Sequence, residues 1–177
     1  FNDFTVVLFA YFDFKNNKLI IEDELVINGK QLLSEEFSKK VLEKEKGRWI
    51  NPITGDSKPP FLRVSDNNNL IFLNDLNKYQ LNFLTIDKRE SETALNNMRQ
   101  LIKNERIIIN PRCKILISHL RNAIWNASRT SYRRSSDNGH FDAVDSLKYL
   151  VRAVNFNKNP YPVGDRKSTR LNSSHTD

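Results

Sequence analysis

Two aspartates stand three residues apart at the start of the last amphipathic segment of the chain. Asp142 and Asp145 fall on neighbouring positions of a helix surface, because residues three apart are adjacent there. Both lie in the first turns, where the helix dipole favours negative charge. Carboxylates placed in this way can bind a hard cation such as Mg²⁺ through oxygen. On spacing alone, a dipole-facing charge at Asp142 and a solvated charge at Asp145 are the simpler interpretation.

A third aspartate and a histidine extend this set. Asp66 directly follows a short apolar segment and precedes three asparagines. Ligands in open α/β sheets gather beyond the carboxyl ends of strands, so Asp66 is a candidate ligand of the same cation. An Asx turn over residues 67–69 explains Asp66 without a ligand. His140 could contact a phosphate, assist proton transfer or cap the helix, and capping is the simplest role.

A basic loop, residues 129–135, precedes the acidic segment. Arg129, Arg133 and Arg134 are suited to bind phosphates, and Tyr132 is suited to stack or pack. The combination suits a nuclease, because the nucleic-acid backbone must be held while metal ions act on one phosphate. An ordinary surface loop is the alternative.

The remaining polar candidates receive structural interpretations. His119 lies among apolar neighbours and is expected to be a core histidine. Cys113 is expected to be a small core or loop residue. Strand alternation turns Glu22 and Glu24 to one face and Asp23 to the other, and a solvated sheet edge is their expected environment.

The hydrophobic pattern predicts the elements that must position these residues. Early β-branched and aromatic runs predict an antiparallel hairpin, and later segments alternate helices with short strands, which indicates a mixed α/β sheet. One helix is expected to be capped by Ser34 and ended by Gly47. Segment 70–76 fits either a helix or an extended strand. Strands are predicted at 4–12, 19–28, 61–65, 81–86 and 106–109, and further helices at 87–104, 112–125 and 140–154.

The bulk properties exclude several protein classes. The 177 residues are a one-domain length, and 38% hydrophobic and 28% charged residues argue against a disordered or membrane protein. A single cysteine can form neither an internal disulfide nor a structural zinc site, which fits an intracellular location. The formal net charge of +7 favours polyanion partners.

The last thirteen residues, 165–177, stand apart in composition. They read DRKSTRLNSSHTD and contain a single apolar residue, Leu171. The segment resembles the translation of a common sequencing adapter, so we treat it as a non-native tail. We expect a folded domain over 1–156 and an extended exit over 157–164.

Several motifs occur in a familiar order. Residues 139–149 read GHFDAVDSLKY, and residues 63–66 read RVSD. The first resembles the final-helix motif of the C-terminal nuclease domain of phage terminase large subunits. In that motif a His or Asp precedes an Asp, and a DALxY-like stretch follows. Here residues 145–149 match that stretch, with Ser146 in the usual Ala place. The second resembles that family's second acidic motif. Segments 1–5, 112–125 and 159–162 also match its layout.

The resemblance implies an RNase H-like fold, a mixed sheet flanked by helices, whose first strand would precede Phe1. It implies two divalent metal ions, Mg²⁺ or Mn²⁺, with Asp66 and Asp142 as ligands. Asp145 would be a third ligand or an outer group, and His140 an accessory catalytic group. Such a site would cleave double-stranded DNA with little sequence preference.

The resemblance also implies partners. These are double-stranded viral DNA, an ATPase domain in the same protein, the portal and the small terminase subunit. The expected location is the host cytoplasm during phage assembly, with no membrane partner. The family's first metal-binding Asp is expected before Phe1, because Asp3 falls in a turn. We therefore expect weak or no cleavage by the 177 residues alone.

Two alternatives stay open. One is another RNase H-like enzyme, such as a resolvase or transposase. The other is a non-catalytic DNA- or capsid-binding domain of a phage protein, which the basic charge supports.

Overall fold

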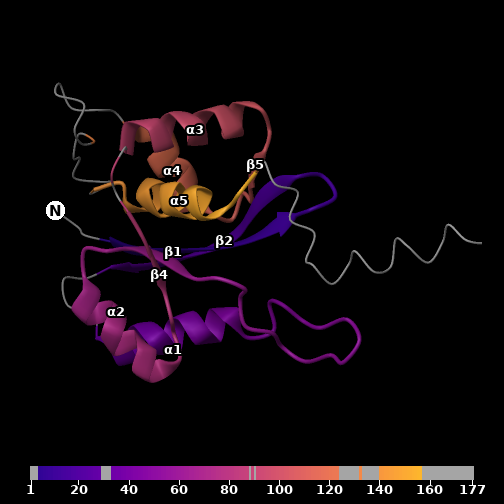
Figure 1. Cartoon of the computed structure of the whole chain (residues 1–177), viewed down its shortest axis with the longest axis vertical. Helices are drawn as coiled ribbons and strands as arrows, with labels where there is room; N and C mark the ends of the chain where they lie inside the picture. The colour runs from indigo at the N-terminus through magenta and orange to yellow at the C-terminus, as the bar shows by residue number, and fades with distance from the viewer. Residues whose placement is uncertain are drawn as a thin grey trace, which may run out of the picture.

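A long antiparallel hairpin forms the centre of the molecule, and the helices pack on its two faces (Figure 1). The computed structural model describes residues 4–28, 33–87, 89, 91–123, 132 and 140–156. Strand β1 (Phe4–Asp13) pairs with β2 (Lys18–Asn28) along its whole length. The short strand β5 (Ile107–Ile109) adds to β2 in parallel, which confirms the predicted mixed sheet.

The remaining elements are α1 (Ser34–Glu45), β3 (Val64–Asp66), α2 (Leu70–Leu76), the 3-10 helix η1 (Asn77–Tyr79), β4 (Leu84–Ile86), α3 (Ser91–Lys103), α4 (Lys114–Asn122) and α5 (Asp142–Ala153). Helices α3, α4 and α5 cover one face of the hairpin sheet, and α1 and α2 lie on the other face (Figure 1). The short strands β3 and β4 pair in parallel as a separate small sheet.

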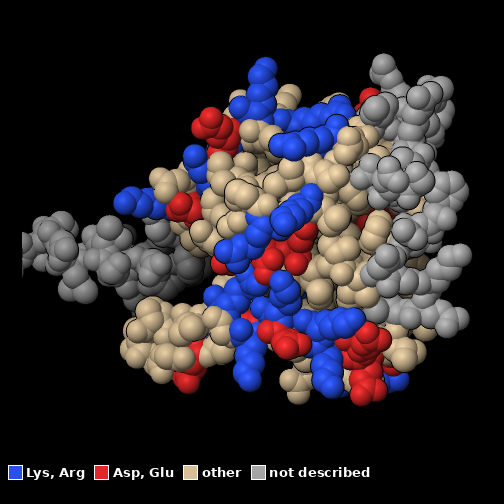
Figure 2. Space-filling view, turned by 180° about the vertical axis from the view of Figure 1, so that it is seen from behind, with Lys and Arg blue, Asp and Glu red and all other residues tan. Residues whose placement is uncertain are grey.

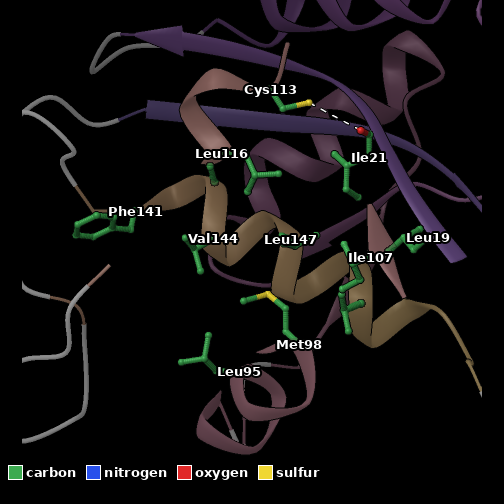
Figure 3. Close-up of a cluster of buried hydrophobic side chains, with 12 residues drawn as sticks. Leu19, Ile21, Leu95, Met98, Ile107, Cys113, Leu116, Phe141, Val144 and Leu147 are labelled. Atoms are coloured by element: carbon green, nitrogen blue, oxygen red, sulfur yellow. Dashed lines mark hydrogen bonds between the residues drawn. The ribbon is translucent and has the colours of Figure 1, made fainter. Parts of the chain in front are cut away.

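The larger core lies between the sheet and α5. Phe141, Val144, Leu147 and Val151 recur at the predicted helical spacing and are at most 3% exposed. In Figure 3, Val144 and Leu147 of this row lie between Leu116 of α4, Ile107 of β5 and the two α3 residues Leu95 and Met98, which belong to the same cluster. The apolar face of α5 therefore fixes which way its polar residues point.

Cys113 belongs to the same core. Its Sγ lies 4.0 Å from the carbonyl oxygen of Ile21 (Figure 3). Burial raises the pKa of the Cys113 thiol to about 11, with a contribution from the Glu24 carboxylate. The thiol is therefore neutral at ordinary pH, and the structural role expected of Cys113 is confirmed.

A second, smaller core lies on the opposite face of the hairpin. It is formed by buried apolar residues of β2, α1, α2 and the segment before β4: Ile27, Phe37, Val41, Leu76 and Leu81. Within the described part of the chain, no helix has the length and apolar character that crossing a membrane requires.

Several predicted boundaries shift. Segment 70–76 is a helix because the Asn69 side chain accepts a hydrogen bond from the Phe72 N–H. Strand β3 is shorter than predicted, and Phe61 is fully exposed outside it. Ser34 does not cap α1, since its hydroxyl binds Asp75 instead. Gly47 follows α1 with a φ of 73°, as expected for a glycine that ends a helix.

A β-bulge alters the environment predicted for the three acids of β2. Phe9 pairs with Asp23 and Ala10 with Ile21, so Glu22 is the extra residue. The bulge interrupts the alternation, and Glu22 and Asp23 both reach Arg48, at 3.2 and 2.6 Å. The predicted solvated edge is therefore wrong for Asp23, which is 9% exposed and also bound to Lys44.

Glu24 points to the other face and caps a helix. Its two carboxylate oxygens accept the N–H groups of Ile115 and Leu116 at 2.8 and 2.9 Å. These N–H groups belong to the first turn of α4, where the helix has no internal acceptors for them. Glu24 thus anchors α4 on the sheet from a position distant in sequence.

Replacement of Glu24 by Ala should lower the free energy of unfolding by about 2 kcal/mol, because two charge-assisted hydrogen bonds to a helix start are lost. Urea titration followed by circular dichroism measures the effect. The matched control is Glu43→Ala, an exposed glutamate of α1. Equal losses in the two variants would contradict the capping role.

Candidate functional site

The predicted acidic residues line one cleft. Asp66, Asp142 and Asp145 are all part of its wall, together with His140 and Lys148. The cleft has a volume of about 1480 Å³ and runs along β1 from the start of α5 to α1 and α2. Its acidic end is formed by α5 and β3, and its other end is apolar, with Phe37, Phe72 and other side chains of the smaller core.

Asp142 is the first residue of α5, and the way the helix starts fixes its direction. The preceding residue, Phe141, has a left-handed conformation with φ 61° and ψ 37°. Asp142 Oδ2 accepts the Phe4 N–H at 3.3 Å, and the Ser146 hydroxyl donates to the Val6 carbonyl at 3.1 Å. Helix α5 is thus bound to β1 on the cleft side through two polar contacts.

His140 lies on the cleft wall but not at the predicted capping position. The N-cap of α5 is Phe141, whose own side chain makes no capping hydrogen bond. His140 therefore lies one residue before the N-cap, and its capping role stays a prediction. Its place in the cleft keeps a chemical role available.

Asp66 is the last residue of β3, as the sequence predicts. Its Oδ1 accepts the Asn68 N–H at 3.2 Å, which is the Asx turn considered as the alternative to a ligand. The same residue also borders the cleft. The turn fixes the carboxylate at the strand end, so the two interpretations of Asp66 are compatible.

Lys148 is a residue of the cleft that the sequence interpretation missed. Its ammonium group contacts Asp145 Oδ1 at 2.5 Å and donates to the Ser91 hydroxyl at 3.0 Å. The lysine is only 6% exposed. The available signal was its spacing three residues after Asp145, which places opposite charges side by side on a helix.

The negative charge of the cleft contributes to the raised pKa values of two tyrosines. Burial raises the pKa of Tyr149, and the carboxylates of Asp145, Asp66 and Asp142 raise it further. Burial raises the pKa of Tyr132 to about 12, with a contribution from Asp145. Both phenols are neutral at physiological pH. The three carboxylates therefore share one electrostatic environment around Tyr149, although they come from two elements.

The sequence also predicts phosphate-binding arginines and a set of metal ligands at this site. Arg129, Arg133 and Arg134 lie outside the described residues. Among the residues that the structure describes, no three side chains of His, Cys, Asp or Glu are grouped so that they could hold a metal ion. On the face opposite to that of Figure 1, Lys and Arg side chains are interspersed with Asp and Glu (Figure 2). Among the described residues on this face, basic and acidic side chains are mixed, without a uniform basic patch.

The fold has a counterpart among solved structures. The large terminase of a thermophilic bacteriophage aligns with 86% of this chain at a TM-score of 0.66 and 14% sequence identity. A second crystal form of that terminase gives a TM-score of 0.66 at 15% identity, and its complex with ATP-γ-S gives 0.64 at 14%. The chain shares the fold of part of a large terminase. This mixed α/β architecture is consistent with an RNase H-like domain.

The likeness is structural and partial. The chain covers 37% of the length of the terminase chain in the first of these structures. No family model matches the sequence, and no curated protein matches it. At this identity the comparison shows the fold, so the chemistry must be argued from the residues of the cleft.

His119 supports the cleft from within the core, which confirms its predicted place. It is 1% exposed, and its ring meets Phe141 edge-on at 5.3 Å and Phe4 at 6.3 Å. Burial lowers the pKa of His119. The folded protein therefore favours the neutral form of the His119 ring, which packs against Phe4 and Phe141.

This burial predicts an acid sensitivity. The unfolded chain binds a proton at His119 near pH 6.5, whereas the folded protein binds it only at lower pH. The free energy of unfolding should therefore fall as the pH drops below about 6.5. In a His119→Leu variant the fall between pH 7 and pH 5 should be smaller, as measured by urea titration at both values. The same fall in variant and wild type would refute the assignment.

Proposed function

We propose that the chain is the metal-dependent endonuclease domain of a phage large terminase, which cleaves double-stranded viral DNA during genome packaging. The observation that carries the proposal is the convergence of Asp66 and Asp142 on one cleft, in a fold shared with a large terminase. The two residues are 76 positions apart (142 − 66) and belong to different elements. If Asp66 and Asp142 each served only the structure of its own element, the two side chains would have no reason to line the same cleft.

The donors suit a hard divalent cation. Mg²⁺ prefers oxygen ligands, retains several waters and is commonly held by one or two carboxylates together with substrate phosphates. Asp66 and Asp142 offer such oxygens, with Asp145 as a third ligand or an outer group. A bound Mg²⁺ or Mn²⁺ pair would activate a water and stabilise the leaving oxygen of a phosphodiester.

The protein groups have separate tasks in this scheme. The Asn68 N–H holds the Asp66 carboxylate at the strand end, and the Phe4 N–H holds Asp142 at the helix start. The neutral Tyr149 phenol adds no negative charge to the cleft. His140 borders the cleft, where it can hydrogen-bond a phosphate oxygen or accept a proton. Arg129, Arg133 and Arg134 would contact the DNA backbone.

The wider setting is part of the proposal. A terminase large subunit would join this domain to an ATPase domain and work with the portal and the small terminase subunit. It would act in the host cytoplasm during phage assembly. A non-catalytic DNA-binding domain is the second candidate, favoured by the formal net charge of +7, which suits a polyanion partner without any metal.

Asp142→Asn and Asp66→Asn in the full-length protein should each reduce plasmid cleavage in Mg²⁺ or Mn²⁺ by about 100-fold or more, because metal stabilisation of the transition state is worth several kcal/mol. Asn preserves the Asx turn at position 66, so the fold is retained. DNA affinity, measured by fluorescence anisotropy, should stay close to wild type.

The matched control is Asp56→Asn, an exposed aspartate in the loop before β3. Cleavage that is equal in the three variants and the wild type would overturn the catalytic assignment. DNA binding without cleavage by the wild-type protein would instead support the non-catalytic domain.

A further inference from the structure

The described part of the cleft contains one deeply buried cation, the ammonium group of Lys148. The lysine projects from α5 one turn after Asp145, and its side chain is 8% exposed. A charge removed from water in this way is tolerated only when it is paired and hydrogen-bonded. Both conditions are met by the Asp145 carboxylate and the Ser91 hydroxyl.

The pairing commits the Asp145 carboxylate. The contact between Lys148 Nζ and Asp145 Oδ1 is 2.5 Å. A metal ion that bound Asp145 directly would stand beside the ammonium group and would be repelled by it. Ser91, the first residue of α3, accepts a second hydrogen bond from the ammonium group at 3.0 Å.

We propose that Lys148 is a positioning residue that holds Asp145 outside the metal coordination, so that Asp66 and Asp142 are the ligands that this pair of elements supplies. The inference rests on the proposed nuclease function and assigns a different role to each of the three acids. Asp145 and Lys148 form a neutral pair at the margin of the site. Through Ser91 the pair also ties the start of α3 to α5.

The test compares single and paired replacements in the full-length protein, with Mn²⁺ alone as the probe. Asp145→Asn leaves the buried ammonium group without its partner, so both Mn²⁺ affinity and the urea midpoint of unfolding should fall. The double variant Asp145→Asn with Lys148→Met removes both charges together. Its Mn²⁺ affinity should return to within about threefold of wild type, because the two replacements are coupled.

A ligand role for Asp145 predicts the opposite result. The double variant would then stay at least about tenfold weaker for Mn²⁺, as Asp142→Asn does, because a coordinating oxygen is lost. That outcome would overturn the inference. A double variant less stable in urea than both Asp145→Asn and Lys148→Met alone would also overturn it, since the two residues would not form a stabilising pair.

The proposed function can fail separately. If Asp142→Asn leaves Mn²⁺ binding by the protein unchanged, the metal site itself is disproved, and the inference falls with it. If Asp142→Asn weakens binding and the double variant does not recover, the nuclease proposal stands and only the role of Lys148 is wrong. Calorimetric titration of wild type, Asp145→Asn, Asp142→Asn and the double variant with MnCl₂ separates these results without a cleavage assay.

Discussion

The geometry of the acidic cleft depends on the burial of Phe141. This residue adopts a left-handed backbone conformation, which costs about 1–3 kcal/mol for a side chain of its size. Burial of a phenylalanine contributes about 1.5–3 kcal/mol, and edge-on contacts with two rings add about 0.5–1.5 kcal/mol each. Those contacts are made with His119 and Tyr132. Packing thus offsets the strain, and the sharp entry into α5 places Asp142 toward β1.

The burial of Phe141 also explains why the acids can lie in a cleft at all. The first turn of α5 closes on the carbonyl oxygen of Phe141, which accepts the N–H groups of Val144 and Asp145. The first turn of α5 is therefore anchored in the core on one side and carries its carboxylates on the other.

Local sequence patterns predicted much of this arrangement, but they failed where contacts with residues distant in sequence determine the structure. The apolar spacing of α5 and the hairpin were visible in sequence, as was the strand-end place of Asp66. The bulge at Glu22 was not, because a single extra residue in β2 leaves no local signal and yet moves Asp23 to Arg48. The helix cap by Glu24 and the burial of Lys148 likewise arise from partners on other elements.

Asp142 and Asp66, the proposed metal ligands, are held by different parts of the fold. Asp142 is tied to β1 through the Phe4 N–H, and Ser146 adds a second tie at Val6. Asp66 is held within its own turn through the Asn68 N–H, at the end of β3. The distance between the two carboxylates therefore depends on the position of α5, which its contacts with β1 fix, relative to the end of β3. A cation that binds both acids would join α5 to β3 across the cleft, so metal binding and the rigidity of α5 should be linked.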